Sequence, residues 1–318
     1  MEPTPSAPAI SRRRSAGRLL WRNPLFKSGL VLLLGLAVLA AAAPLLTRAR
    51  ILHQPIQQHL AGLDEDGMPL SPGGRYFLGT DNLGRDVLSR VIYAGRVSLT
   101  LGVGSMLVAT VIGVTFGLIS GFYGGKLDLV LMRFTEMNMT IPSILLAIAF
   151  AGLMDGRVLH LHPAWLPWHF LDVQLKRGIV SLFILIGFVC WPGMVRVIRG
   201  QVLAVKEREF VVASRVLGAS DGRLMLEHVL PTVLPTVIVI AAMTTANTIA
   251  LEAGLGYLGI GVPPPTPTWG GMIAEGQAYF IAAPALVIAP GLAIVLTVLA
   301  LNLIGQGLQE ALDTKQKS

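Results

Sequence analysis

The sequence predicts an all-α integral membrane protein with six transmembrane helices and both termini in the cytoplasm. Hydrophobic residues make up 53% of the 318 positions and charged residues only 14%, compared with about 25% charged residues in ordinary globular proteins. The mean hydropathy is +0.67. Six stretches without a charged side chain also reach the length of about 20 residues that a spanning helix needs. The single cysteine, Cys190, excludes a fold held by intramolecular disulfides.

The charge-free stretches define the individual spans. They occupy residues 28–47, 97–125, 137–154, 178–195, 228–251 and 276–309. A seventh uncharged stretch, 253–274, is rich in proline and glycine, and its backbone would leave hydrogen bonds unsatisfied in lipid. We expect it to form a loop or a re-entrant segment. The first span is expected to remain as an anchor, because Pro44 would obstruct cleavage after the preceding alanines.

The distribution of Lys and Arg predicts the orientation. Of the 25 basic residues, 16 fall on the side that holds both chain ends, which favours that side as the cytoplasm. This asymmetry accounts for the net charge of +7 without nucleic-acid binding. The expected organisation is a basic tail 1–27, an anchor 28–47, an exterior segment 48–96, a five-helix core 97–309 that includes a cytoplasmic loop 196–230, and a tail 310–318.

The second span carries small residues four positions apart: Ser105, Ala109, Gly113, Gly117 and Gly121. They share one helix face, on which another helix backbone can approach closely. The neighbouring helix belongs either to this subunit or to a partner.

The fifth span carries a polar face. Thr244, Thr248 and Glu252 are spaced to lie on one side of the helix, with Thr245 beside them. Polar groups at this depth face either a transport pathway or another helix, and both alternatives remain open. No series of ionisable residues runs through the spans, which argues against a proton-coupled or sodium-coupled carrier.

No catalytic motif appears. The sequence contains no P-loop, HExxH or GxSxG pattern, so we expect a non-catalytic chain without a nucleotide, cofactor or metal site of its own. His160 and His162 lie beside Trp165 and Trp168, which favours a loop at the membrane interface over a metal site.

The loop 196–230 has a helical pattern. Apolar residues recur at helical spacing from Lys206 to Leu217, and Gly218 is expected to end this helix. Ser220 or Asp221 would cap a second short helix that reaches Glu227, and Pro231 would open the next span. The loop is either a rigid protrusion that docks on a soluble partner or a loop that lies on the surface.

The same loop resembles the EAA loop of ABC importer permeases. It departs from that pattern at Val212, Ser214 and His228, which replace a glutamate, an alanine and an isoleucine. The resemblance implies a type I importer fold in which this loop contacts ATPase subunits. It assigns the contact to Glu209, Ala213, Ser214, Arg215, Gly218, Ala219, Ser220, Asp221, Leu230 and Pro231.

Two further segments resemble permeases of the dipeptide, oligopeptide and nickel family. Residues 78–90 are similar to its LGTDxxGRDxxSR segment, through Gly79, Thr80, Asp81, Gly84, Arg85, Asp86, Ser89 and Arg90. Residues 258–270 are similar to its Pro-rich exterior loop, through Gly259, Pro263, Pro264 and Trp269. Asp81, Arg85, Asp86 and Arg90 are expected to form an ion-paired clamp or a purely local pairing. Trp269 is expected to pack the Pro-rich loop at the membrane interface.

The resemblance implies an importer of the bacterial inner membrane, in which this chain is the C-type permease. Its partners would be a homologous B-type permease, two cytoplasmic ATPases that bind ATP and magnesium, and an external substrate-binding protein. Short peptides are the expected substrate, with nickel, glutathione and opines as alternatives. Two other classes remain: an ion-coupled carrier that needs no ATPase, and a membrane scaffold.

Overall fold

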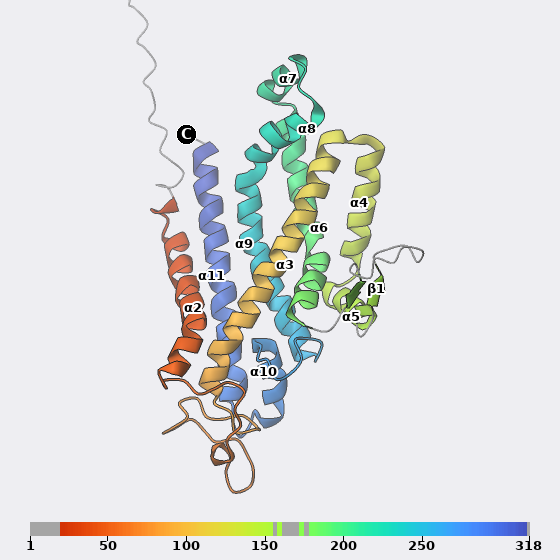
Figure 1. Cartoon of the computed structure of the whole chain (residues 1–318). Coiled ribbons are helices and arrows are strands. Elements are labelled where there is room, and N and C mark those ends of the chain that lie inside the picture. Colours follow the sequence, from red (N-terminus) through yellow and green to blue (C-terminus); the bar gives the residue numbers. More distant parts are fainter. Residues whose placement is uncertain (1–19, 155–157, 161–171, 175–177, 317–318) are drawn as a thin grey trace, which may run out of the picture.

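A computed structural model describes residues 20–154, 158–160, 172–174 and 178–316. Within them, five helices are long and apolar enough to cross a membrane, and a bent helix pair makes a sixth candidate span. The helices run lengthwise through one bundle (Figure 1). The predicted all-helical membrane fold is confirmed, with one span broken.

The first span is helix α2 (Pro24–Arg48), which agrees closely with the prediction. Asn23 caps it, since its side-chain Oδ1 accepts hydrogen bonds from the backbone nitrogens of Leu25 and Phe26 at 2.8 and 3.2 Å. The helix packs along α11 (Ala285–Gln316), which begins later than the predicted 276.

Helix α3 (Val87–Tyr123) begins at Val87 rather than at residue 97. The charge-free criterion placed the boundary after Arg96, whereas Asp86 caps the helix at its true start by accepting from the Ser89 backbone nitrogen at 3.0 Å. The predicted exterior segment 48–96 therefore ends within a helix.

The small residues of α3 pack against helix α6 (Ile179–Lys206) of the same chain. A methyl group at Gly113 would lie 2.5 Å from Cβ of Met194, and one at Gly117 would lie 2.8 Å from Cβ of Ile198. This settles the open alternative in favour of packing within the subunit. Helix α6 also continues past the predicted end at 195, because Arg196 and Arg199 ended the uncharged stretch without ending the helix.

The predicted continuous span 137–154 is wrong. Helices α4 (Gly125–Thr140) and α5 (Ser143–Met154) are bent by 93° at Ile141 and Pro142. Proline disfavours the helical conformation for the residue before it, and Ile141 is accordingly extended. A short antiparallel pair follows, β1 (Val158–His160) with β2 (Asp172–Gln174). Most of the His- and Trp-containing loop lies outside the described residues.

The predicted second short helix of the loop 196–230 is not separate. Helix α8 (Asp221–Arg223) and the π-helical segment η3 (Leu224–Val229) run directly into α9 (Leu230–Tyr257), so that one 37-residue helix extends from Asp221 to Tyr257. Pro231 lies in the first turn of α9, as predicted.

The stretch 253–274 is not a span, as predicted. It holds the end of α9, a loop, and the start of the short helix α10 (Trp269–Gly276), which the 3-10 turn η4 (Gln277–Tyr279) follows.

The two ends of the bundle differ. Helix α7 (Glu209–Val216) lies at the end where α2 begins and α11 finishes, which we call the α7 end (Figure 1). Helix α10 and the segment 49–86, which includes the 3-10 turn η1 (Leu60–Gly62), lie at the opposite end, the α10 end.

Candidate functional site

At the α10 end, the segment 78–90 folds into a tight turn that aims charged side chains at α10. Asp81 Oδ1 accepts hydrogen bonds from the backbone nitrogens of Leu83 and Arg85, each at 2.9 Å. Gly79 and Gly84 have φ of 77° and 70°, a conformation that favours glycine. The spacing of the motif therefore follows from the geometry of this turn.

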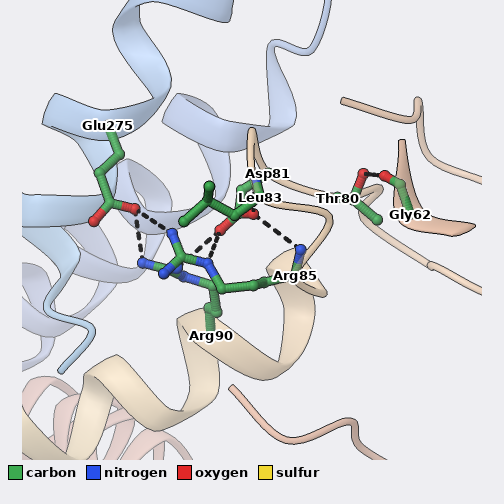
Figure 2. A network of polar contacts seen from close by, with 7 residues as sticks. All are labelled: Gly62, Thr80, Asp81, Leu83, Arg85, Arg90 and Glu275. Atoms are coloured by element: carbon green, nitrogen blue, oxygen red, sulfur yellow. Dashed lines mark hydrogen bonds and ion pairs between the residues drawn. The ribbon is translucent and has the colours of Figure 1, made fainter. Parts of the chain in front are cut away.

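Four side chains form a closed network of charges, the clamp (Asp81, Arg85, Arg90, Glu275). Asp81 Oδ2 lies 2.6 Å from Nε of Arg85 and 2.8 Å from Nη1 of Arg90. Glu275 Oε2 lies 3.0 Å from Nη2 of Arg85 and 2.8 Å from Nη2 of Arg90 (Figure 2). The two arginines and two carboxylates balance in charge. The predicted ion pairing of Asp81 with Arg85 and Arg90 is confirmed.

The clamp is mostly buried. Asp81, Arg85 and Arg90 are at most 5% exposed in their side chains, whereas Glu275 is 34% exposed. Burial raises the pKa of the Glu275 carboxyl, and the charge of Arg85 opposes this in part. Sequence reasoning missed Glu275, whose only signal was that it is the first charge after the uncharged stretch 253–274.

Asp86 does not belong to the clamp, contrary to the prediction. Its carboxylate caps α3, accepts from the Ser89 hydroxyl and lies 3.6 Å from Nδ1 of His53. The Ser89 hydroxyl oxygen also accepts from the backbone nitrogen of His53 at 2.9 Å. These groups hold the segment 49–86 against the start of α3.

Thr80 performs the same task on the other side of the turn. Its hydroxyl accepts from the backbone nitrogen of Leu70 at 2.8 Å and donates to the carbonyl of Gly62. The segment that precedes the clamp is therefore tied to it by buried hydrogen bonds (Figure 2).

Trp269 fixes α10 to α3, which corrects the expectation that it packs the Pro-rich loop. The side chain is buried, and its Nε1 donates to the carbonyl of Val91 at 3.0 Å. Its backbone nitrogen donates to Ser98 Oγ at 3.3 Å. A cavity of about 260 Å³ lies next to Trp269, and its wall includes Gly259, Pro263, Pro264 and Glu275.

The polar face of α9 lies inside the chain. Thr244, Thr245, Thr248 and Glu252 are all buried. The Thr248 hydroxyl donates to the carbonyl of Gly102 in α3 at 3.0 Å and to that of Thr245 at 2.9 Å. This contact supports the role in helix packing and gives no support to a lining of the pathway.

At the α7 end, a hairpin of α7 and α8 projects beyond the long helices (Figure 1). Helix α7 begins at Glu209 rather than at Lys206, and Gly218 ends the turn with φ of 87°, as expected. Val211 and Leu224 are buried and join the hairpin to Phe122 of α3. Val216 and Leu217, at the end of the predicted apolar face, are 82% and 88% exposed.

The other predicted contact residues lie along this hairpin and at the start of α9. Glu209, Ala213, Arg215, Gly218, Ser220, Asp221 and Pro231 are exposed, and Ser214, Ala219 and Leu230 are half-buried. Ser220 occupies the cap position of α8 without a side-chain capping bond.

An ion pair that sequence reasoning missed braces the base of the hairpin. Arg199 of α6 places Nε and Nη2 at 2.6 Å from the two carboxylate oxygens of Asp128 in α4. The Ser120 hydroxyl also donates to Asp128, and Arg215 of α7 lies over the Phe122 ring at 5.4 Å. Helices α3, α4, α6 and α7 are thus linked at this end.

The described residues form a helical bundle with candidate membrane spans and a hairpin that projects from one end (Figure 1). Residues 113–318 match the family model described as binding-protein-dependent transport system inner membrane component. The chain belongs to this family of inner-membrane ABC importer permeases.

Curated relatives cover most of the chain. The chain is 33% identical over 325 residues to the dipeptide transport system permease of Alkalihalophilus pseudofirmus, covering 100% of this chain and 97% of the relative. It is 38% identical over 244 residues to the di/tripeptide transport system permease of Pseudomonas aeruginosa, covering 77% and 74%. It is 35% identical over 255 residues to the glutathione transport system permease of Pectobacterium atrosepticum, covering 80% and 78%.

Proposed function

We propose that this chain is the C-type permease of a short-peptide importer and forms half of the translocation pathway with a homologous B-type permease. The whole-length similarity to a dipeptide permease supports this substrate class. Glutathione, which a relative is named for, is itself a small peptide and is the main alternative.

The observation that carries the proposal is the hairpin between α6 and α9. Val216 and Leu217 present bare apolar surface outside the bundle, a feature typical of a protein interface. Val211 and Leu224 anchor the same hairpin to the core. A partner that moves the hairpin would therefore move two spans directly.

Two cytoplasmic ATPases are the proposed partners at this surface. They would bind ATP and magnesium, and this chain would contribute no catalytic group. Closure of the ATPase dimer would bias the permease between two arrangements, as nucleotide-driven switches do. If the ATPases bind at the α7 end, that end and both termini are cytoplasmic. This orientation agrees with the Lys and Arg distribution.

At the opposite end, the clamp would present the segment 49–86 and α10 as one unit to a substrate-binding protein. Glu275 belongs to α10, whereas its partners Arg85 and Arg90 precede or open α3. The clamp would thus keep the segment 49–86 and α10 in a fixed relative position while substrate is delivered.

Co-purification tests the proposal. The tagged chain is solubilised gently from its native membrane, and the eluate is examined for bound proteins and for ATP hydrolysis. We expect a second permease and ATPases in the wild type, and loss of the ATPases alone in a Val216→Asp/Leu217→Asp variant. As a matched control, Ile281→Asp changes a 99% exposed residue shortly after η4 (Gln277–Tyr279) and should retain the ATPases. A solitary chain that still transports would favour the ion-coupled carrier.

A further inference from the structure

A second cavity lies at the α10 end, away from the clamp. It measures about 600 Å³ and lies between the last turn of α2, the first turns of α3, the start of α6 and the Pro-rich loop. Its polar lining consists of Thr47, Arg48, Gln54, Tyr93, Arg96, Thr100 and Thr266. None of these residues takes part in the contacts of the clamp.

The charge of this cavity is positive and uncompensated. Arg48 and Arg96 reach it from two different helices, and no carboxylate belongs to its lining. Among the residues that the structure describes, neither arginine forms an ion pair within 4.0 Å. The Tyr93 hydroxyl donates to Thr47 Oγ1 at 3.0 Å and holds two polar groups of the wall together. The cavity thus offers two guanidinium groups and the Thr47 hydroxyl to an oxyanion.

An apolar surface continues from the cavity along α3. Val103, Leu107 and Val111 are 45%, 55% and 66% exposed. Their spacing places them on the same helix face as Arg96 and Thr100, which line the cavity. Helix α2, which packs against α3, carries a second exposed apolar surface, with Val38 and Leu45 at 64% and 63%.

This combination has the layout of an amphiphile site. The guanidinium groups lie at the ends of membrane spans, where the polar headgroups of a bilayer begin. The apolar faces of α2 and α3 lead from them into the part of the bundle that lipid chains would contact. A soluble anion would use the arginines alone and leave the apolar surface without a role.

We propose that this cavity binds the headgroup phosphate of an anionic phospholipid through Arg48 and Arg96, with an acyl chain along Val103, Leu107 and Val111. Guanidinium groups suit phosphate oxygens because they present several fixed donors. The bound lipid would touch α2, α3, α6 and the Pro-rich loop at once. In the orientation proposed above it lies in the outer leaflet, but its binding does not depend on that orientation or on the substrate.

Native mass spectrometry of the purified complex tests this site. Delipidated complex is titrated with phosphatidylglycerol, with phosphatidylcholine and with free glycerol phosphate. We expect one phosphatidylglycerol to bind more tightly than phosphatidylcholine, and glycerol phosphate not to displace it. Arg48→Gln/Arg96→Gln should weaken phosphatidylglycerol binding by about tenfold or more, since hydrogen bonds to charged groups are lost.

The matched control is Arg50→Gln/Arg75→Gln, which removes the same charge from exposed arginines at the same end that do not line this cavity. It should bind phosphatidylglycerol as the wild type does. Equal binding by both variants, or equal binding of phosphatidylcholine, would overturn the proposal. Displacement by glycerol phosphate would identify an oxyanion site without lipid.

A second measurement on the unaltered protein guards against a variant that fails to fold. Phosphatidylglycerol with a photoreactive acyl chain is cross-linked to the wild-type complex, and the labelled peptide is sequenced. Labelling within 103–111 of α3 is the expected result. Labelling elsewhere only, as would follow if the second permease covers this face, contradicts the proposal.

Discussion

Arg90 and Glu275 lie 185 positions apart in the chain, yet Nη2 of Arg90 lies 2.8 Å from Oε2 of Glu275. The contact joins the first turns of α3 to α10 across the end of the bundle. Because Asp81 also binds Arg90, the short turn before α3 and a helix from the other end of the sequence are held by one guanidinium group.

The two carboxylates of the clamp should differ in their contribution to stability. Asp81→Asn removes a 4% exposed charge that two buried arginines share, and we expect a loss of about 3–5 kcal/mol of unfolding free energy. Glu275→Gln alters a partly exposed side chain that can still accept hydrogen bonds, and we expect a change within about 1 kcal/mol. Thermal unfolding of the purified variants measures both.

The control for that comparison is Glu136→Gln, which alters an ion pair in which the Arg133 and Glu136 side chains are 72% and 54% exposed. Its midpoint should match the wild type. An Asp81→Asn midpoint as high as that of Glu136→Gln would show that the clamp does not hold the fold.

The raised pKa of Glu275 predicts a particular pH dependence. In the folded chain the carboxyl holds its proton at pH values where the unfolded chain has already released it. This group therefore contributes most to stability below its ordinary pKa, and that contribution falls as pH rises through the raised value.

The unfolding midpoint of the wild type minus that of Glu275→Gln should accordingly increase as pH falls from 7.5 towards 4. Both proteins share Asp81, Arg85 and Arg90, so the difference isolates Glu275. A difference that grows with rising pH would mean that the carboxyl is stabilised chiefly as an anion.

The α3–α6 contact predicts a position-specific effect of adding a methyl group. Gly113→Ala would force Cβ against Met194 at 2.5 Å and should destabilise the protein by about 1–3 kcal/mol. Gly200→Ala, in open space on α6, should be neutral or should stabilise the helix by about 0.5–1 kcal/mol. Unfolding midpoints in matched detergent separate the two, and equal effects would place the packing face elsewhere.

Substitution of Gly218 by valine should abolish coupling to the ATPases without preventing insertion of the chain into the membrane. Nothing lies within 4 Å of an added Cβ, so the constraint at this residue is its φ of 87°. Gly218→Val should strain the hairpin by about 1–2 kcal/mol and abolish transport, while the chain still reaches the membrane. Gly218→Asn should restore part of the activity, since Asn tolerates this conformation.

The neighbouring Gly222→Val serves as the control, because it also has open space but no such backbone conformation. It should retain coupling better than Gly218→Val. Uptake by Gly218→Val at the wild-type rate would favour the carrier or the scaffold.

The sequence predicted a span well where charged residues lie only near the ends of the helix, as in α2. It failed where charged residues lie further inside a helix. Arg96 and Arg196, which set the predicted boundaries, lie within α3 and α6, so a charge-free window covers only part of each helix. The break at Pro142 was also lost, since the residues on both sides of it are uncharged.

The candidate site was predicted only in part, because one sequence reveals local features but not tertiary contacts. The turn at Asp81 and the left-handed Gly218 are local features that their neighbours in sequence determine. The contacts of Arg90 with Glu275 and of Arg199 with Asp128 depend on tertiary structure, and no spacing in one sequence encodes them.

Dipeptide uptake into proteoliposomes tests the central claim most directly. The complex is reconstituted with its substrate-binding protein, and uptake is measured with and without ATP in the compartment that the ATPases face, first without an ion gradient and then with one. The account predicts uptake that requires both ATP and the ATPase subunits. Uptake by this permease without ATPase subunits, driven by an ion gradient, would contradict it.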